Sequence, residues 1–174
     1  MPDIHLSHNF EQRMLVARIL HSALEAVNST RILPRFVKLD GARLSVPGRV
    51  YELAAFRHIH VLSLGKAALP MAYSLEELIG GRLQGRLVIT KNAGGYPKGA
   101  LEVIEAGHPV PDERSLRAGQ AALDFLQEIR ADDLLICAIS GGGSALLAAP
   151  RPPAAAGKAG RLRARASGAG GRGR

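Results

Sequence analysis

The chain has 174 residues, a length typical of one domain, and 47% of them are hydrophobic, enough for one buried core. Its single cysteine, Cys137, excludes an intrachain disulfide and a cysteine-based metal cage. No apolar run reaches the roughly 20 residues that span a bilayer, and the N-terminus lacks a signal-peptide pattern, so we expect a soluble cytoplasmic protein.

The positive charge of the chain is concentrated at one end. The formal net charge is +8, but residues 151–174 hold seven of the 23 basic residues and none of the 15 acidic ones. The remaining 16 basic and 15 acidic residues give residues 1–150 a net charge of only +1. A nucleic-acid partner, which a basic protein would otherwise suggest, is therefore not expected for the domain itself.

Residues 151–174 differ in composition from everything before them. They are almost entirely Ala, Gly, Arg, Lys and Pro, a composition that predicts disorder because too little apolar surface is available for burial. Three explanations remain open: a basic arm for nucleic acid, a flexible linker, or the product of a shifted reading frame in GC-rich DNA. The abrupt change favours the third, with 1–150 as a partial α/β domain.

Helices and strands are expected to alternate along residues 59–139. In chain order the pattern predicts a helix over 9–28, a turn-rich stretch over 31–57, a strand over 59–64, a helix over 67–79, strands over 87–90 and 101–106, a helix over 113–130 and a strand over 133–139. This alternation indicates an α/β fold with a doubly wound, mostly parallel Rossmann-like sheet and helices on both faces. We expect the sheet to be incomplete at its C-terminal side.

Two of these elements carry specific burial predictions. In the helix over 113–130, Leu116, Leu123 and Leu126 are expected to face inward, and Asp112 is expected to cap the N-terminus. The strand over 133–139 is almost continuously apolar, which favours burial on both faces of a parallel sheet. Cys137 lies in this run and is interpreted as a small buried hydrophobic residue.

Two unusual segments follow strands, and ligands of such sheets bind at the carboxyl ends of strands. One is Gly65-Lys66-Ala67-Ala68, in which the Lys66 ammonium can reach a phosphate or carboxylate. The other comprises, in chain order, Ser140, Gly141, Gly142, Gly143 and Ser144. Its glycines can present backbone N–H groups to an anion, and its serines can donate hydroxyl hydrogen bonds. The alternatives are a solvated surface lysine and a plain flexible loop.

A third loop, over 106–113, contains two prolines and joins a strand to the long helix. His108 in this loop is a candidate acid–base group or ligand contact, with a structural histidine as the more common alternative. Asp112 is more often a helix cap than a catalytic acid at such a place. Residues 1–150 contain neither the GxxxxGK[ST] nor the GxGxxG nucleotide motif, so generic phosphate loops do not decide the function.

Together these segments resemble the N-terminal domain of the glycerate 2-kinase family that carries a MOFRL domain. The matching stretches are LSLGKAALPMAYSLEELIG over 62–80, EAGHPVPDERSLRAG over 105–119 and ADDLLICAISGGGSALLAAP over 131–150. The resemblance implies transfer of the ATP γ-phosphoryl group to the 2-hydroxyl of D-glycerate, with Mg²⁺. It also implies an active-site role for Lys66 and a cradle for phosphate or carboxylate over 140–144.

The chain is expected to depart from this family after residue 150, because the resemblance implies a continuation into more of the domain and a second one. No Mg²⁺ ligands can be placed within 1–150, so we expect the 174-residue chain to be inactive or nearly so. Two alternatives remain. One is a hydroxypyruvate reductase, a label often given to this family, although hydride transfer needs a dinucleotide site and residues 1–150 contain no GxGxxG. The other is a non-catalytic fragment or binding module with a basic tail.

Overall fold

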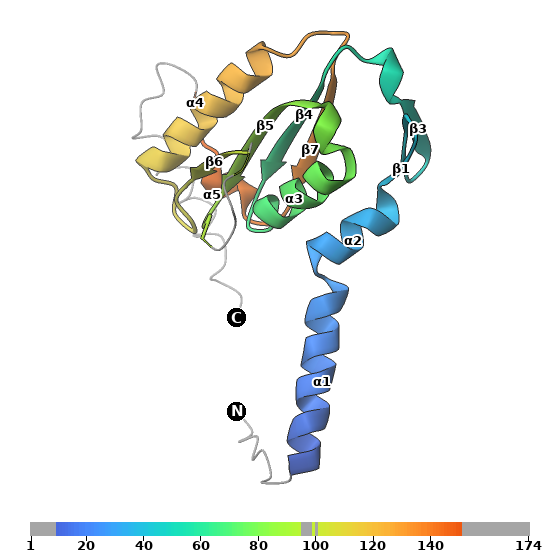
Figure 1. Cartoon of the computed structure of the whole chain (residues 1–174). Coiled ribbons are helices and arrows are strands. Elements are labelled where there is room, and N and C mark those ends of the chain that lie inside the picture. The colour runs from blue at the N-terminus through green and yellow to red at the C-terminus, as the bar shows by residue number, and fades with distance from the viewer. Residues whose placement is uncertain (1–9, 95–98, 100, 151–174) are drawn as a thin grey trace, which may run out of the picture.

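A four-stranded parallel sheet forms the centre of the computed structural model, which describes residues 10–94, 99 and 101–150 (Figure 1). The strand order is β6-β5-β4-β7, and every neighbouring pair is parallel. The strands are β4 (Ile59–Leu64), β5 (Leu83–Thr90), β6 (Glu102–Glu105) and β7 (Leu134–Ile139). The predicted Rossmann-like α/β fold is confirmed, and β5 is longer than the pattern indicated.

Helices cover both faces of this sheet, as expected. On one face, α3 (Ala68–Ile79) packs its buried Leu75 and Ile79 against β4 and β5. On the other face, α4 (Glu113–Gln127) packs against β5 and β6. Successive residues of β5 point to opposite faces of the sheet. Val88 packs with residues of α3, whereas Leu87 and Ile89 pack with residues of α4.

The direction in which strands are added reverses at β4. From β4 the chain proceeds to β5 and β6 on one side, and it then crosses to β7 on the other side of β4. In open α/β sheets, ligands bind outside the carboxyl ends of the strands at such a switch point. The loops that follow β4 and β7 are therefore the segments that define the candidate site.

The N-terminal third forms two helices and a second, antiparallel sheet. Its elements are α1 (Phe10–Ala26), α2 (Ser29–Phe36), β1 (Lys38–Asp40), β2 (Arg43–Val46), β3 (Arg49–Glu52) and the short helix η1 (Leu53–Ala55). Figure 1 shows α1 projecting away from the central sheet. The sequence predicted only turns over 31–57, and two of those turns, at Gly41 and Gly48, connect the new strands.

The burial predictions for α4 and β7 are wrong. Leu116, Leu123 and Leu126 are 39%, 44% and 39% exposed, whereas the buried face of α4 consists of small residues: Ser115, Ala118, Gly119 and Ala122. Cys137 is exposed, because β7 is an edge strand of the described sheet and its α4-side face extends beyond that helix. Partial burial still raises the pKa of the Cys137 thiol.

The remaining short elements are η2 (Gly80–Arg82), after α3, and α5 (Gly143–Leu146), after β7. No helix among the described residues is long and apolar enough to cross a membrane. The predicted disorder of 151–174 and the residue at the start of the first predicted helix, Asn9, lie outside the described residues.

Candidate functional site

The loops after β4 and β7 are tied together at the switch point. The Lys66 N–H donates to the carbonyl of Gly141 (3.0 Å), and the Ser140 N–H donates to the carbonyl of Leu64 (2.8 Å). The Ser140 hydroxyl accepts from the Ala67 N–H (3.0 Å). These bonds fix the start of α3 against the glycine segment, so the two segments singled out in the sequence form one structural unit.

Gly65 allows the two loops to come this close. Its φ of +120° is a backbone conformation that residues with a Cβ rarely adopt. A Cβ at this position would also lie 2.5 Å from the carbonyl oxygen of Ser140 and in collision with the Ser140 hydroxyl. No other residue type fits here without separating the loops.

Lys66, His108 and Gly142 converge on one point at this edge of the sheet. A Cβ built on Gly142 would lie 3.1 Å from Nε2 of His108 and 3.2 Å from Cε of Lys66. Gly142 also has a φ of +93°. The three predicted site loops therefore meet, with an exposed lysine and a partly buried histidine bordering a glycine backbone.

This arrangement is suited to an anion. The N–H groups of Gly141 and Gly142 donate to no acceptor among the described residues, and Cε of the Lys66 side chain lies beside Gly142. Backbone N–H groups of successive glycines and a lysine are common components of phosphate and carboxylate sites. The helix that follows, α5, has only four residues and adds little dipole.

The two serines of the segment have different surroundings. The Ser140 hydroxyl is engaged between the loops, where it also donates weakly to the Leu64 carbonyl (3.5 Å). Ser144 is exposed on α5, and its hydroxyl bonds to none of the described residues. Of the two, only Ser144 keeps a hydroxyl that is uncommitted within the described part of the chain.

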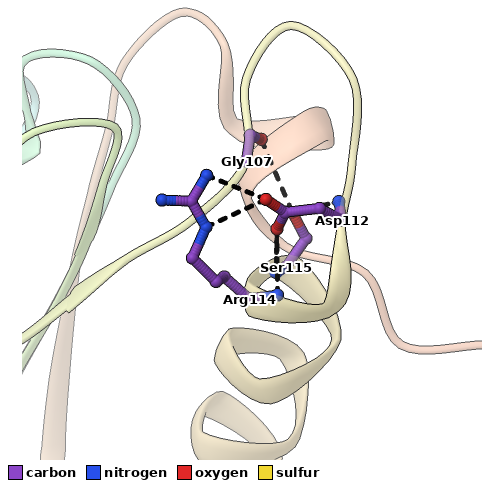
Figure 2. A network of polar contacts seen from close by, with 4 residues as sticks. All are labelled: Gly107, Asp112, Arg114 and Ser115. Carbon is purple, nitrogen blue, oxygen red and sulfur yellow. Dashed lines mark hydrogen bonds and ion pairs between the residues drawn. The ribbon is translucent and has the colours of Figure 1, made fainter.

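Asp112 is the N-cap of α4, as predicted (Figure 2). Its Oδ1 accepts from the N–H groups of Arg114 (2.9 Å) and Ser115 (3.2 Å), and Nε of Arg114 donates to its Oδ2 (2.9 Å). The Ser115 hydroxyl completes the capping box by accepting from the Asp112 N–H (3.2 Å). The hydrogen bond from the Arg114 side chain holds the pKa of Asp112 below its usual value. Asp112 thus positions the loop that carries His108.

A Mg²⁺ site does not fit the described residues at this edge. Oδ1 of Asp112 accepts from two backbone N–H groups and Oδ2 is paired with two nitrogens of the Arg114 side chain, so neither oxygen has a lone pair left for an ion. Mg²⁺ needs an octahedral set of oxygen ligands. Within the described part of the chain, the clustered His, Cys, Asp or Glu side chains that could hold a metal lie at the opposite end of the sheet.

Comparison with known proteins gives the family. A family model described as "Domain of unknown function (DUF4147)" matches residues 15–168. The chain belongs to the DUF4147 family. A glycerate 2-kinase from Pyrococcus horikoshii is 34% identical over 138 residues, which cover 79% of this chain and 30% of that protein.

Two further similarities agree with this placement. The crystal structure of a glycerate kinase from Thermotoga maritima superposes with a TM-score of 0.71 at 24% identity, covering 93% of this chain and 36% of that one, and so shows the fold. A putative hydroxypyruvate reductase from Agrobacterium vitis is 38% identical over 90 residues, which cover 52% of this chain and 20% of that protein. This DUF4147 chain thus spans between 20% and 36% of the length of these three proteins.

Proposed function

We propose that this chain supplies the anion-binding edge of an ATP-dependent glycerate 2-kinase, which transfers the γ-phosphoryl group of ATP to the 2-hydroxyl of D-glycerate. The observation that carries the proposal is the convergence of Lys66 and His108 on the Gly142 backbone at the switch point of the sheet. Relatives named glycerate 2-kinase support the choice of reaction.

Each residue has a role that its position supports. Lys66 offsets negative charge on the phosphoryl group or on the glycerate carboxylate, since phosphoryl transfer depends mainly on positioning and charge neutralisation. The N–H groups of Gly141, Gly142 and Gly143 donate to the same anion, and the Ser144 hydroxyl adds a donor at its rim. His108 contacts the ligand from the opposite loop, while Asp112 and Ser140 hold the loops in place.

Mg²⁺ supplies charge neutralisation between the phosphates in such reactions. The described residues at this edge of the sheet provide no ligand set for the ion. For this reason we expect the 174-residue chain to bind anionic ligands without measurable turnover. A coupled assay for 2-phosphoglycerate with MgATP and D-glycerate tests this, and steady turnover by the chain would contradict it.

Binding of ATP and of 2-phosphoglycerate to the purified chain tests the proposed anion site. By isothermal titration calorimetry, Lys66→Ala is expected to weaken binding by roughly tenfold or more, because one charge-assisted contact is lost. The matched control is Lys38→Ala, which removes an exposed lysine of β1. Equal affinities for the two variants would refute the assignment of Lys66.

A second pair of variants tests the glycine backbone. Gly142→Ala places a Cβ against His108 and Lys66 at a positive φ, so we expect it to weaken the same binding. In Gly141→Ala the added Cβ has no neighbour within 4 Å, so the loop conformation should survive. If both alanine variants bind like the unaltered chain, Gly142 does not border the ligand.

A further inference from the structure

Three metal-ligating side chains cluster at the amino end of the sheet, away from the candidate kinase site. His58 directly precedes β4, His60 is its second residue, and Asp133 directly precedes β7. The side chains of residues 58 and 60 lie on the same face, because successive residues of a strand alternate. Since β4 and β7 pair in parallel with Ile59 opposite Leu134, Asp133 lies beside His58.

The distances within this cluster are somewhat longer than those between ligands of one metal ion. Nδ1 of His58 is 3.4 Å from Oδ1 of Asp133, and Nε2 of His60 is 3.6 Å from Oδ2 of Asp133. All three ligand atoms lie within 4.8 Å of one another. A tetrahedral Zn²⁺ site with bonds of 2.0–2.1 Å has ligand atoms about 3.3 Å apart. Only a small adjustment of the imidazoles is therefore needed.

The burial of His60 and Asp133 and the hydrogen bonding of the His60 ring support a ligand-binding role for this cluster. The side chains of His60 and Asp133 are only 9% and 2% exposed. Nε2 of His60 is buried and makes no hydrogen bond among the described residues, although buried polar groups are almost always satisfied. Nδ1 of the same ring packs against Gly85, where a Cβ would lie at 2.6 Å, so the ring is held with Nε2 toward the carboxylate.

The carboxylate is also held in place. Its Oδ1 accepts from the His58 N–H (3.1 Å), and its Oδ2 accepts from the Arg130 N–H (2.9 Å). Each oxygen keeps a further lone pair for a metal. The ring of Phe125 in α4 packs edge-on against His60, with centroids 5.9 Å apart, and closes one side of the cluster. His58, at 36% exposure, forms the open side.

We propose that His58, His60 and Asp133 form a binding site for a divalent transition-metal ion, with Zn²⁺ as the expected occupant. Imidazole and carboxylate are the ligands that Zn²⁺ takes with three protein donors and a water in the fourth position. The ion links His58 and His60, at the start of β4, to Asp133, which directly precedes β7. Its role is therefore to fix edge strand β7 to the sheet. Strands of six residues place it about 20 Å from the glycine segment.

Metal binding to the full 174-residue chain tests the proposal. After chelator treatment and dialysis, Zn²⁺ is expected to bind one ion per chain by calorimetry. The melting temperature should rise by roughly 5 °C or more when free Zn²⁺ exceeds Kd a hundredfold. Co²⁺ should give the visible absorption of a tetrahedral site and broaden the imidazole NMR signals of His58 and His60. These measurements use the unaltered chain and do not depend on the folding of any variant.

Variants locate the site. His58→Ala removes the most exposed ligand and should weaken Zn²⁺ binding at least about tenfold. His21→Ala removes an exposed histidine of α1 and should leave it unchanged. Both are compared in a Cys137→Ser background, which excludes capture by the exposed thiol. Equal Zn²⁺ affinity for the two histidine variants overturns the proposal. So does the absence of one-to-one binding, which would leave the cluster as a simple histidine–aspartate ion pair.

Discussion

At the scale of single residues, Gly65 and Gly142 serve the candidate site in different ways. Gly65 lets two backbones approach, because any Cβ there would meet the Ser140 backbone. Gly142 leaves space between two side chains, and a Cβ there would reach His108 and Lys66. The first glycine is needed for the loops to fit together, whereas the second keeps open the place where a ligand would lie.

Asp112 gives a residue-scale prediction about pH. The Arg114 side chain lowers the pKa of Asp112, so its ionised form is the one that stabilises the fold. The contribution is present above the ordinary pKa of about 3.8 and is lost as pH falls through the lowered pKa of the folded chain. Asp112→Asn, which keeps a capping oxygen, should lower the melting temperature by about 1–4 °C at pH 7 and have a progressively smaller effect as the pH falls below 3.8.

The control for this prediction is Glu77→Gln, which neutralises an exposed carboxylate of α3 that has no hydrogen bond among the described residues. Its melting temperature should follow the unaltered chain across the pH range. Melting curves recorded by circular dichroism from pH 2 to 7 provide the comparison. If the Asp112→Asn variant stays less stable by the same amount at every pH, the charge of Asp112 contributes nothing.

Strand pairing limits how much of the candidate site can be predicted from the sequence. Lys66, His108 and the glycine segment were singled out because each follows a strand, and the structure brings all three together. Their separations were not predictable, because they depend on β7 lying next to β4, a pairing of residues 75 positions apart, such as Ile59 with Leu134. The same holds for the proposed metal ligands. The His-x-His spacing is visible in the sequence, but Asp133 joins it only through that pairing.

At the scale of elements, long periodic segments were predicted well and short ones were not. Strands β1, β2 and β3 have only three or four residues and no apolar run, so the turns at Gly41 and Gly48 were recognised without the strands between them. In α4 the leucines also recur on one side of the helix. The small residues were nevertheless buried, because they allow a closer approach to neighbouring backbone.

Gly119 tests this explanation of α4. Its added Cβ would overlap the carbonyl oxygen of Ala148 and lie 2.7 Å from the carbonyl carbon, and both atoms are backbone. Gly119→Ala should therefore destabilise the fold by about 1–3 kcal/mol in urea unfolding, although alanine is normally favoured over glycine within a helix by about 1 kcal/mol. The Ala148 N–H, which donates to the Ser115 carbonyl (3.1 Å), should also exchange faster with solvent.

Gly81→Ala is the matched control, because its Cβ meets nothing within 4 Å. This variant should be as stable as the unaltered chain or slightly more stable. A Gly119→Ala chain of unchanged stability would mean that the backbone around Ala148 moves away easily. The close packing of α4 would then not explain why its leucines stay outside.

At the scale of the whole molecule, the described residues leave two apolar surfaces uncovered. The first is the α1 stripe: Val16, Leu20, Leu24 and Val27 are 44% to 70% exposed on or just after a helix that projects from the sheet (Figure 1). The second is the α4-side face of β7, where Ile139 is 68% exposed. Contiguous apolar surface of this kind favours association, and an edge strand presents unpaired backbone groups to other chains.

We therefore expect the purified 174-residue chain to associate in a concentration-dependent manner, with the α1 stripe as the main contact. Leu20→Lys places a charge in the centre of this stripe and should shift the chain toward monomer in sedimentation velocity experiments. Ser22→Lys adds the same charge to the same helix outside the stripe and should leave association unchanged. If the two lysine variants behave alike, net charge rather than apolar contact controls association. If the unaltered chain stays monomeric at every concentration, the exposed stripe is tolerated in solution.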